Sequence, residues 1–392
     1  MSSSILHSSE APHVVERRLG SGVVQPKELS FVAGCGAELV DSEGRVFLDC
    51  AAGHGAASLG HAHPILARSI ADQAGRLITC TPSYGNDQRA EYLARLSDVL
   101  PAGLGRPFLC NSGTEAAEAA LKYARLSTGR SGVVACVRGF HGRTMGALSV
   151  TAEKRYREPF APLVPGASHV PYNRVEALEA AVDENTAAVI LEVIQGEGGV
   201  RPADEAFLAA ARAACDAAGA LLIVDEVQTG FGRTGRLLAI EHSGLRPDLV
   251  CLAKGIGGGV PMGALAMADH LDPWPPGAHG STFGGNPLAC AAGLCVLNVL
   301  QGGLLDHARA MGERLMGGLR SIDSKRVREV RGRGLMVGVE LRERVAPVLA
   351  ELQQRRIIAL PAGPQVLRLL PPLVIEADQI DHLLTVLQEV LA

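Results

Sequence analysis

The sequence predicts an α/β protein in which helices cover both faces of a mostly parallel β-sheet, with a second, smaller α+β domain. Apolar runs of strand length alternate with helical stretches through the middle of the chain, as is typical of parallel strands buried on both faces. This alternation stops near Pro287, where a long Ala- and Leu-rich helix begins. The length of 392 residues also favours more than one domain.

The first part of the chain predicts a hairpin, two helices and a strand that runs straight into a third helix. Residues 38–49 alternate in polarity around an Asp-Ser-Glu-Gly turn, which indicates a β-hairpin. Helical spacing follows over residues 65–77 and 91–100. A short apolar strand at 107–110 leads into a helix at 115–126.

Regular alternation follows, and then the pattern changes. We expect strands at 133–137, 187–193, 220–224 and 249–253, with a helix at 205–218. The second domain should contain a helix at 288–300, strands at 327–330, 335–341 and 366–369, and two further helical stretches. The hairpin has no obvious partner in the parallel sheet, so we expect it to join this domain. The resulting limits are 1–60 and 288–392 for the small domain and 61–287 for the large one.

Composition excludes several classes of function. The net charge is −4 and no basic stripe occurs, so we expect no nucleic-acid partner. The nine cysteines form no CxxC pair, which favours a reduced, cytoplasmic protein. Residues 1–12 are Ser-rich without an apolar core, unlike a signal peptide, and the longest apolar runs are about strand length, unlike a membrane span. His61 and His63 lack further ligands nearby, so we expect no metal site.

The first candidate functional feature is the turn Ser112-Gly113-Thr114, between the strand at 107–110 and the next helix. Free N–H groups and the helix dipole at such a position favour a phosphate. An ordinary helix N-cap remains the alternative interpretation.

The second is Asp225, at the end of the apolar strand 221–224. A buried carboxylate needs a partner, and a pyridinium nitrogen would suit because the ion pair keeps the ring protonated. The alternative is a metal ligand, which is less favoured because no glycine-rich Lys-Ser/Thr loop accompanies it.

The third is Lys254, between the strand ending at Ala253 and the glycine-rich stretch 255–259. Desolvation at a strand end lowers the pKa of a lysine and makes it nucleophilic, and glycines allow a cofactor close to the backbone. A surface lysine or a dinucleotide-binding loop are the alternatives, although the third glycine of such a loop is missing.

The fourth is the loop 280–287, Gly-Ser-Thr-Phe-Gly-Gly-Asn-Pro, which is either an anion-binding loop or a flexible connector. Taken together, the four features supply a phosphate cradle, a carboxylate for a ring nitrogen, a Schiff-base lysine and extra hydroxyls. Pyridoxal 5'-phosphate is the cofactor that needs this combination.

The chain resembles the class III pyridoxal phosphate aminotransferases over roughly residues 25–390. The likeness is greatest to the acetylornithine aminotransferase group, including the relatives that act on lysine bound to the carrier protein LysW. The motifs that carry it lie at residues 59–64, 111–116, 139–144, 195–199, 225–230, 254 and 280–287. The resemblance implies fold type I, with a seven-stranded sheet in the large domain.

The resemblance also implies roles for individual residues. Lys254 is the catalytic residue and forms the Schiff base. Binding of the cofactor is assigned to a set of eight further residues: Ser112, Gly113, Thr114, Phe140, Asp225, Val227, Gln228 and Thr282. Of these, Thr282 is expected to reach the cofactor phosphate of the partner subunit, which implies a homodimer with active sites at the interface.

Substrate contacts are implied for Arg143, which holds a carboxylate, and for the neighbouring Ser281. Glu197 and Arg368 form a switch in the family: the glutamate neutralises the arginine and then releases it to bind 2-oxoglutarate or glutamate. A permanent salt bridge is the alternative. His54 occupies a position at the substrate entrance where it either tunes substrate choice or is polar filler.

We therefore expect the terminal amino group of LysW-bound lysine, or of N-acetylornithine, to be transferred to 2-oxoglutarate in lysine and arginine biosynthesis. The alternatives are an N-acetylornithine enzyme of arginine synthesis alone, and a 4-aminobutyrate or ornithine aminotransferase. An aminomutase or racemase would need no 2-oxoglutarate, and a cofactor-binding regulator would need a DNA-binding domain for which the chain lacks spare length.

Overall fold

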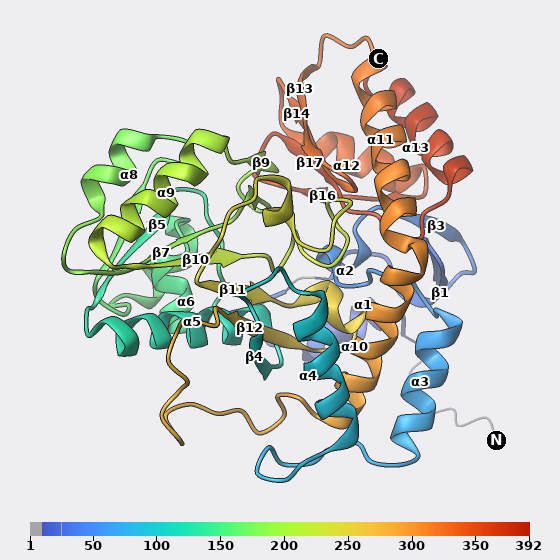
Figure 1. Ribbon diagram of the computed structural model, residues 1–392. Coiled ribbons are helices and arrows are strands. Elements are labelled where there is room, and N and C mark those ends of the chain that lie inside the picture. Colours follow the sequence, from blue (N-terminus) through green and yellow to red (C-terminus); the bar gives the residue numbers. More distant parts are fainter. Residues whose placement is uncertain (1–9, 25) are drawn as a thin grey trace.

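The centre of the molecule is a seven-stranded sheet with the strand order β4-β12-β11-β10-β7-β5-β6 (Figure 1). The computed structural model describes residues 10–24 and 26–392. In this sheet only β12 runs antiparallel to its neighbours, so the predicted, mostly parallel seven-stranded sheet is confirmed. The strands are β4 (Arg106–Cys110), β5 (Gly132–Cys136), β6 (Ala167–Val170), β7 (Thr186–Leu191), β10 (Leu221–Asp225), β11 (Leu249–Leu252) and β12 (Gly263–Met267).

Helices cover both faces of this sheet, as the continuous apolar strands predict. In Figure 1, α8 (Val175–Ala181) and α9 (Glu205–Ala218) lie on one face, and α5 (Gly113–Thr128) and α6 (Met145–Val150) lie on the other. The buried side of α5 is largely alanine, including Ala116, Ala117 and Ala120. These small side chains let the helix lie close to the strands, and its first turn meets the edge where the candidate residues lie.

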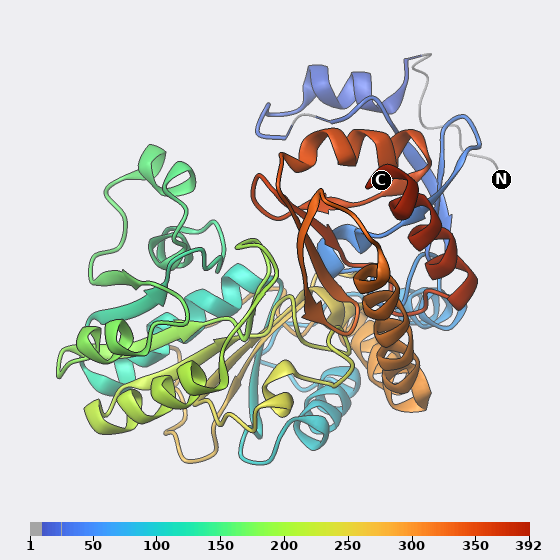
Figure 2. The same cartoon turned by 90° about the horizontal axis from the view of Figure 1, so that it is seen from above.

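A second set of elements packs beside the sheet. The antiparallel sheet β13-β14-β17-β16 carries α11, α12 and α13, and β2 and β3 form the predicted hairpin, whose strand β3 pairs in parallel with β15. Figure 2 shows the N-terminal strands next to the C-terminal elements. The bounds are β1 (Phe31–Cys35), β2 (Glu38–Asp41), β3 (Val46–Asp49), β13 (Val327–Arg333), β14 (Met336–Leu341), β15 (Ile357–Ile358), β16 (Leu360–Pro361), β17 (Val366–Leu369), α11 (Leu305–Ser321), α12 (Val345–Gln354) and α13 (Ala377–Val390).

A long helical segment connects the two sets. Helix α10 (Pro287–Val299) is followed by a π-helical turn at Leu300–Leu304, which is kinked at Gly303 (φ +115°), and then by α11. Helix α10 packs on α3 (Pro64–Ala74) and α4 (Asp87–Val99). By length and composition alone, the segment Pro287–Ser321 could cross a membrane, but 61% of its apolar window is buried in the protein. The expectation that apolar runs do not exceed strand length was therefore wrong here. The residues of α10 are mostly Ala, Gly, Cys and Leu on every side of the helix, because nearly the whole helix is buried in the core.

Some elements were not predicted, among them β1, β6, β12 and α11. Strand β12, Gly-Ala-Leu-Ala-Met, lacks β-branched residues, and only its burial between β4 and β11 makes it a strand. The smaller elements are α1 (Pro12–Leu19), α2 (Ala52–Gly55), α7 (Lys154–Arg157), β8 (Ile194–Gln195) and β9 (Arg201–Pro202). Residues 1–9 of the predicted N-terminal tail lie outside the described residues. All nine cysteines are unpaired, as expected.

Candidate active site

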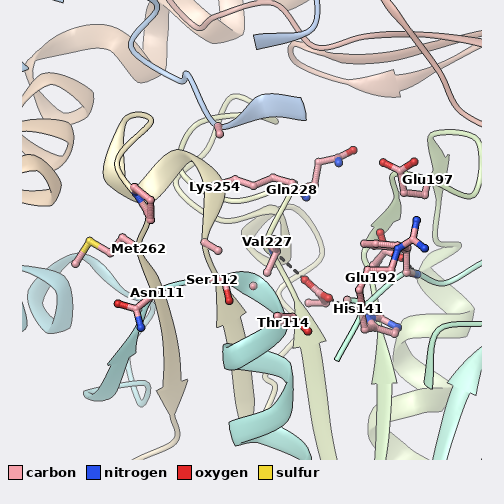
Figure 3. A pocket seen from close by; sticks show the side chains of 18 of the residues that line it. Asn111, Ser112, Thr114, His141, Glu192, Glu197, Val227, Gln228, Lys254 and Met262 are labelled. Carbon is pink, nitrogen blue, oxygen red and sulfur yellow. Dashed lines mark hydrogen bonds and ion pairs between the residues drawn. The ribbon is translucent and has the colours of Figure 1, made fainter. Parts of the chain in front are cut away.

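A cavity of about 460 Å³ opens at the carboxyl ends of the parallel strands. Its lining includes side chains at the ends of four strands. Asn111, Glu192 and Lys254, labelled in Figure 3, come just after β4, β7 and β11, and Asp225 is the last residue of β10. This is the edge at which open α/β sheets bind ligands.

The turn after β4 begins helix α5 and lines the cavity. Ser112 caps the helix, because its hydroxyl accepts a hydrogen bond from the Glu115 amide at 3.3 Å. The amides of Gly113 and Thr114 have no acceptor among the described residues, so two donors at the positive end of a 16-residue helix remain free. A Cβ at Gly113 would lie 2.7 Å from Cγ1 of Val227, so only glycine allows this close approach.

Asp225 ends β10 and is almost fully buried. Its Oδ1 accepts a hydrogen bond from the Val227 amide at 2.9 Å, and its Oδ2 accepts one from Nδ1 of His141 at 2.8 Å. Burial opposes protonation of His141, but the bond to Asp225 and its charge outweigh that effect and raise the pKa of the imidazole. The carboxylate that the sequence singled out therefore has a buried histidine as its partner, to which the sequence analysis gave no role.

Glu192 is a second buried carboxyl on the cavity wall. It accepts hydrogen bonds from the amides of Phe140 at 3.0 Å and Gly196 at 2.9 Å. Burial, together with the nearby charge of Asp225, raises its pKa to about 7 in spite of His141. The strand-end argument that selected Asp225 did not select Glu192, because the expected strand 187–193 includes Glu192, whereas β7 ends at Leu191.

Lys254 follows β11 and extends to the cavity in Figure 3. Its φ of +48° is unusual for a residue with a side chain, and such strain is concentrated at functional sites. Burial lowers the pKa of its amine, although Asp225 and Glu197 act in the opposite direction. Within the described chain the amine has no hydrogen-bond partner, so it is free to act as a nucleophile.

Two aromatic rings lie beside the cavity. Phe140 is part of its lining, and its ring meets that of Tyr156 edge-on, with centroids 6.1 Å apart. The guanidinium of Arg143, which also lines the cavity, lies 3.6 Å from the centroid of the Tyr156 ring. The sequence singled out Phe140 and Arg143 but not Tyr156.

The pair of Glu197 and Arg368 is present. Nη1 of Arg368 donates to Oε1 of Glu197 at 2.5 Å and to Oε1 of Gln228 at 3.2 Å. Arg368 is only 1% exposed, whereas Glu197 lines the cavity, where it is 32% exposed at its side chain. Burial alone would raise the pKa of Glu197, but Arg368 lowers it, so the glutamate is charged and balances the buried arginine.

His54 lies near this pair. Burial, Arg368 and Lys254 lower the pKa of its imidazole, and Glu197 acts against them. The residue has a φ of +59° and is exposed. It is therefore within electrostatic reach of Glu197 and Arg368 but is not part of the cavity lining.

Ser281 and Thr282 do not line the cavity of their own chain. Ser281 accepts hydrogen bonds from Nδ2 of Asn111 at 3.1 Å and from the Gly284 amide at 3.0 Å. Thr282 is exposed, and its neighbour Phe283 is 61% exposed. Thr282 is therefore solvent-exposed on its own chain and does not contribute to the lining of this cavity.

The residues present fit pyridoxal 5'-phosphate. Two free amides at the start of α5 suit a phosphate, Asp225 suits a protonated ring nitrogen, and the free amine of Lys254 suits an aldehyde. No group of three or more His, Cys, Asp or Glu residues that could hold a metal ion occurs in residues 10–24 and 26–392. His61 instead bonds to Asp49 at 2.7 Å, and Nδ1 of His63 accepts from the Leu66 amide.

Comparisons with known proteins agree with this geometry. Residues 23–391 match the family model of the class III aminotransferases. The [LysW]-aminoadipate semialdehyde transaminase of Deinococcus radiodurans is 49% identical over 96% of this chain and 89% of its own length. The acetylornithine aminotransferase of Methanopyrus kandleri is 48% identical over 93% of this chain and 94% of its own.

A solved structure shows the same fold with the cofactor. The ornithine aminotransferase of Toxoplasma gondii, described with partial occupancy of pyridoxal phosphate at its active site, superposes with a TM-score of 0.90. It is 35% identical, and the match covers 96% of this chain and 92% of that one. The chain therefore belongs to the class III aminotransferase family and is a pyridoxal phosphate-dependent transaminase.

Proposed function

We propose that this enzyme transfers the terminal amino group of LysW-bound lysine to 2-oxoglutarate, giving LysW-bound aminoadipate semialdehyde and glutamate, and that N-acetylornithine is its second substrate. The pair of Glu197 and Arg368 at the cavity is the observation that carries this proposal. An enzyme of this kind must admit an amine and a dicarboxylate to one site, and a buried arginine with a movable counter-ion allows both. The relatives named above support the choice of substrates.

Cofactor binding is assigned to the residues around the cavity. We propose that Ser112, Gly113 and Thr114 bind the phosphate and that Phe140 and Val227 pack on the two faces of the ring. Asp225 holds the ring nitrogen, and Gln228 donates to the phenolic oxygen. When bound, the cofactor withdraws electrons from the substrate carbon next to the amine.

Lys254 has two tasks in this proposal. Its amine would hold the aldehyde group of the cofactor in the resting enzyme and would be free once a substrate amine is bound there. The released amine then moves a proton at the substrate carbon, as a base and afterwards as an acid. The lowered pKa that burial gives Lys254 suits this work, because a neutral amine is needed to accept the proton.

The substrate carboxylates are assigned to two arginines. Arg143, with Ser281 beside the site, holds the carboxylate of the amino donor. Arg368 binds the α-carboxylate of 2-oxoglutarate after Glu197 has turned away, and otherwise stays neutralised by Glu197. His54, near this pair, tunes the choice of substrate.

The active form is proposed to be a homodimer with sites at the interface. Thr282 and Phe283 are exposed on their own chain, as expected of residues that reach a partner. We further propose that the small domain comprises residues 1–60 and 288–392, that the large domain comprises 61–287, and that the enzyme is cytoplasmic. The pairing of β3 with β15 supports the first of these limits.

An acidic carrier requires exposed cations near the entrance. From the sequence, Arg331 and Arg333 are available for such a contact, but Arg331 is buried and bonded to Glu340 and to the carbonyl oxygen of Gly199. Lys154 and Arg155 are exposed on α7, which also carries the Tyr156 ring against Arg143. These two cations are the better candidates for the carrier contact.

The proposal is tested by measuring kcat/KM for LysW-bound lysine and for N-acetylornithine with 2-oxoglutarate. We expect both to react, the carrier-bound substrate more efficiently. Turnover of N-acetylornithine alone would restrict the enzyme to arginine synthesis. Preference for free ornithine or 4-aminobutyrate would contradict the proposed substrate class, and reaction without any 2-oxo acid would indicate an aminomutase or racemase.

A further inference from the structure

Arg143 is held by an aromatic ring and not by a carboxylate. Its guanidinium carbon lies 3.6 Å from the Tyr156 centroid and 5.6 Å from the Phe140 centroid. No acidic side chain in the described part of the chain forms an ion pair with it. The cation therefore lies at the cavity without a counter-ion.

Tyr156 is itself fixed from two sides. Its ring packs against the Phe140 ring in a T-shaped arrangement, with an angle of 83° between the ring planes. Its hydroxyl accepts a hydrogen bond of 2.9 Å from Nη2 of Arg155. The guanidinium carbon of Arg155 lies 4.7 Å from the same ring centroid. One tyrosine thus connects the ring that lines the cofactor cavity with two arginines.

This arrangement affects both charge and geometry. A free arginine side chain loses much rotamer entropy when it binds an anion, and a guanidinium already stacked on a ring loses less. The ring also offsets part of the lost hydration of the cation. Arg155 adds a second positive charge beside the ring, and because both guanidinium groups are solvent-exposed their attraction for an anion is partly screened by salt.

We propose that Tyr156 is a positioning residue for the amino donor: it holds Arg143 in the orientation that binds the carboxylate of an N-acylated amino acid and so sets the preference for donors that carry this group. This inference rests on the proposed function, in which Arg143 contacts the donor. It concerns how the enzyme discriminates between amino donors that carry a carboxylate and amines that lack one.

The test uses a pair of donors that differ only in the carboxylate, N-acetylornithine and N-acetylputrescine. Wild type should prefer N-acetylornithine. Tyr156→Leu should raise KM for N-acetylornithine roughly tenfold with little change in kcat, because the stack acts in binding and not at the reacting carbon. For N-acetylputrescine its kcat/KM should stay within about twofold of wild type.

The matched control is Tyr156→Phe, which keeps the ring and loses only the bond from Arg155. It should restore KM to within about twofold of wild type. Tyr156→Gln, which is polar but not aromatic, should behave as Tyr156→Leu, and it serves if the leucine variant does not fold. Melting temperatures of all variants show whether folding is intact.

A binding measurement removes chemistry from the question. N-acetylnorvaline lacks the terminal amine of N-acetylornithine and cannot react, so calorimetry gives its Kd directly. We expect Tyr156→Leu to weaken it roughly tenfold and Tyr156→Phe to leave it nearly unchanged.

Equal losses on both donors, or an unchanged Kd for N-acetylnorvaline in Tyr156→Leu, would overturn the inference. Failure of the proposed function looks different. Wild type would then transfer no amino group from either N-acetylornithine or LysW-bound lysine to 2-oxoglutarate, whatever happens at Tyr156.

Discussion

Nδ1 of His141 donates a hydrogen bond of 2.8 Å to Oδ2 of Asp225, and both side chains are buried beside the cofactor cavity. Glu192 adds a second carboxyl nearby. Without the imidazole, Asp225 would lose one of its two hydrogen-bond donors in a buried site that also holds Glu192. His141 therefore supports the charge that Asp225 presents to the ring nitrogen.

The first prediction concerns His141→Leu. The variant should retain pyridoxal phosphate less well, by roughly tenfold in Kd, because Asp225 loses a charge-assisted bond. The cofactor's absorbance, followed during equilibrium dialysis, measures this loss. His141→Gln, which keeps a donor, serves as the control, and equal retention by His141→Leu and wild type would refute the role.

A pH dependence follows from the same contact. The folded pKa of His141 is raised, so its stabilising effect is complete below the unfolded value of about 6.5 and is lost as the pH rises through the folded value. The melting temperatures of cofactor-free wild type and His141→Leu should therefore differ more at pH 6 than at pH 9. A difference that grows with pH would contradict this assignment.

Lys254→Ala should abolish covalent attachment of the cofactor and lower turnover by about 10³-fold or more, because nucleophile and proton-transfer group are lost together. The absorbance band of the attached cofactor at about 420 nm should disappear. If the variant kept both the band and full activity, the assignment of Lys254 as the catalytic residue would be wrong.

Glu197→Gln should leave Arg368 without its counter-ion. Glutamate and 2-oxoglutarate should then bind more tightly, and KM for 2-oxoglutarate should fall by roughly tenfold. KM for N-acetylornithine should rise, because the positive charge of Arg368, no longer neutralised by Glu197, would repel the terminal ammonium group of this substrate. If both KM values stay constant, the pair is a permanent structural salt bridge.

Mixed dimers can test the role of Thr282 across the interface. In one mixture, Lys254→Ala and Thr282→Val lie on different chains, so the only site with a lysine receives an intact threonine. In the other, one chain carries both substitutions, and the remaining lysine-containing site receives valine. We expect tighter cofactor binding in the first mixture, and equal affinities would place Thr282 outside the partner's site.

Gly113→Ala tests the close contact between the start of α5 and Val227, which follows β10. A methyl group there would meet Cγ1 of Val227 at 2.7 Å, so the variant should weaken cofactor binding by roughly tenfold. Val227→Ala in the same chain should restore part of the affinity by making room. A double variant no better than Gly113→Ala would show that the amide geometry at α5, and not the clash, is decisive.

Sequence alone predicted the residues that follow long apolar strands. Asp225 and Lys254 stand out because each ends a run that is fully buried in the sheet. His141 and Tyr156 gave no such signal, since their roles depend on neighbours that only the tertiary structure supplies. His141 is 84 residues from Asp225, and Tyr156 lies in a short exposed helix.

The fold was predicted best where periodicity is strong, and helix α9 spans the expected residues 205–218. Strand β12 was missed because alanine and glycine do not indicate a strand. The expected helix at 288–300 agrees with α10, but α11 was missed. The helical segment resumes after a kink at Gly303, whose φ of +115° is not helical.

The pairing of β4 with β12 has a consequence for the order of events during synthesis. Strand β4 lies at the edge of the sheet and has β12 as its one neighbour there, yet β12 begins only at Gly263. The turn at residues 112–114 lies just past β4, so the strand that leads into it is paired only once residues 263–267 have been synthesised. The complete cofactor site therefore requires about two thirds of the chain to be present.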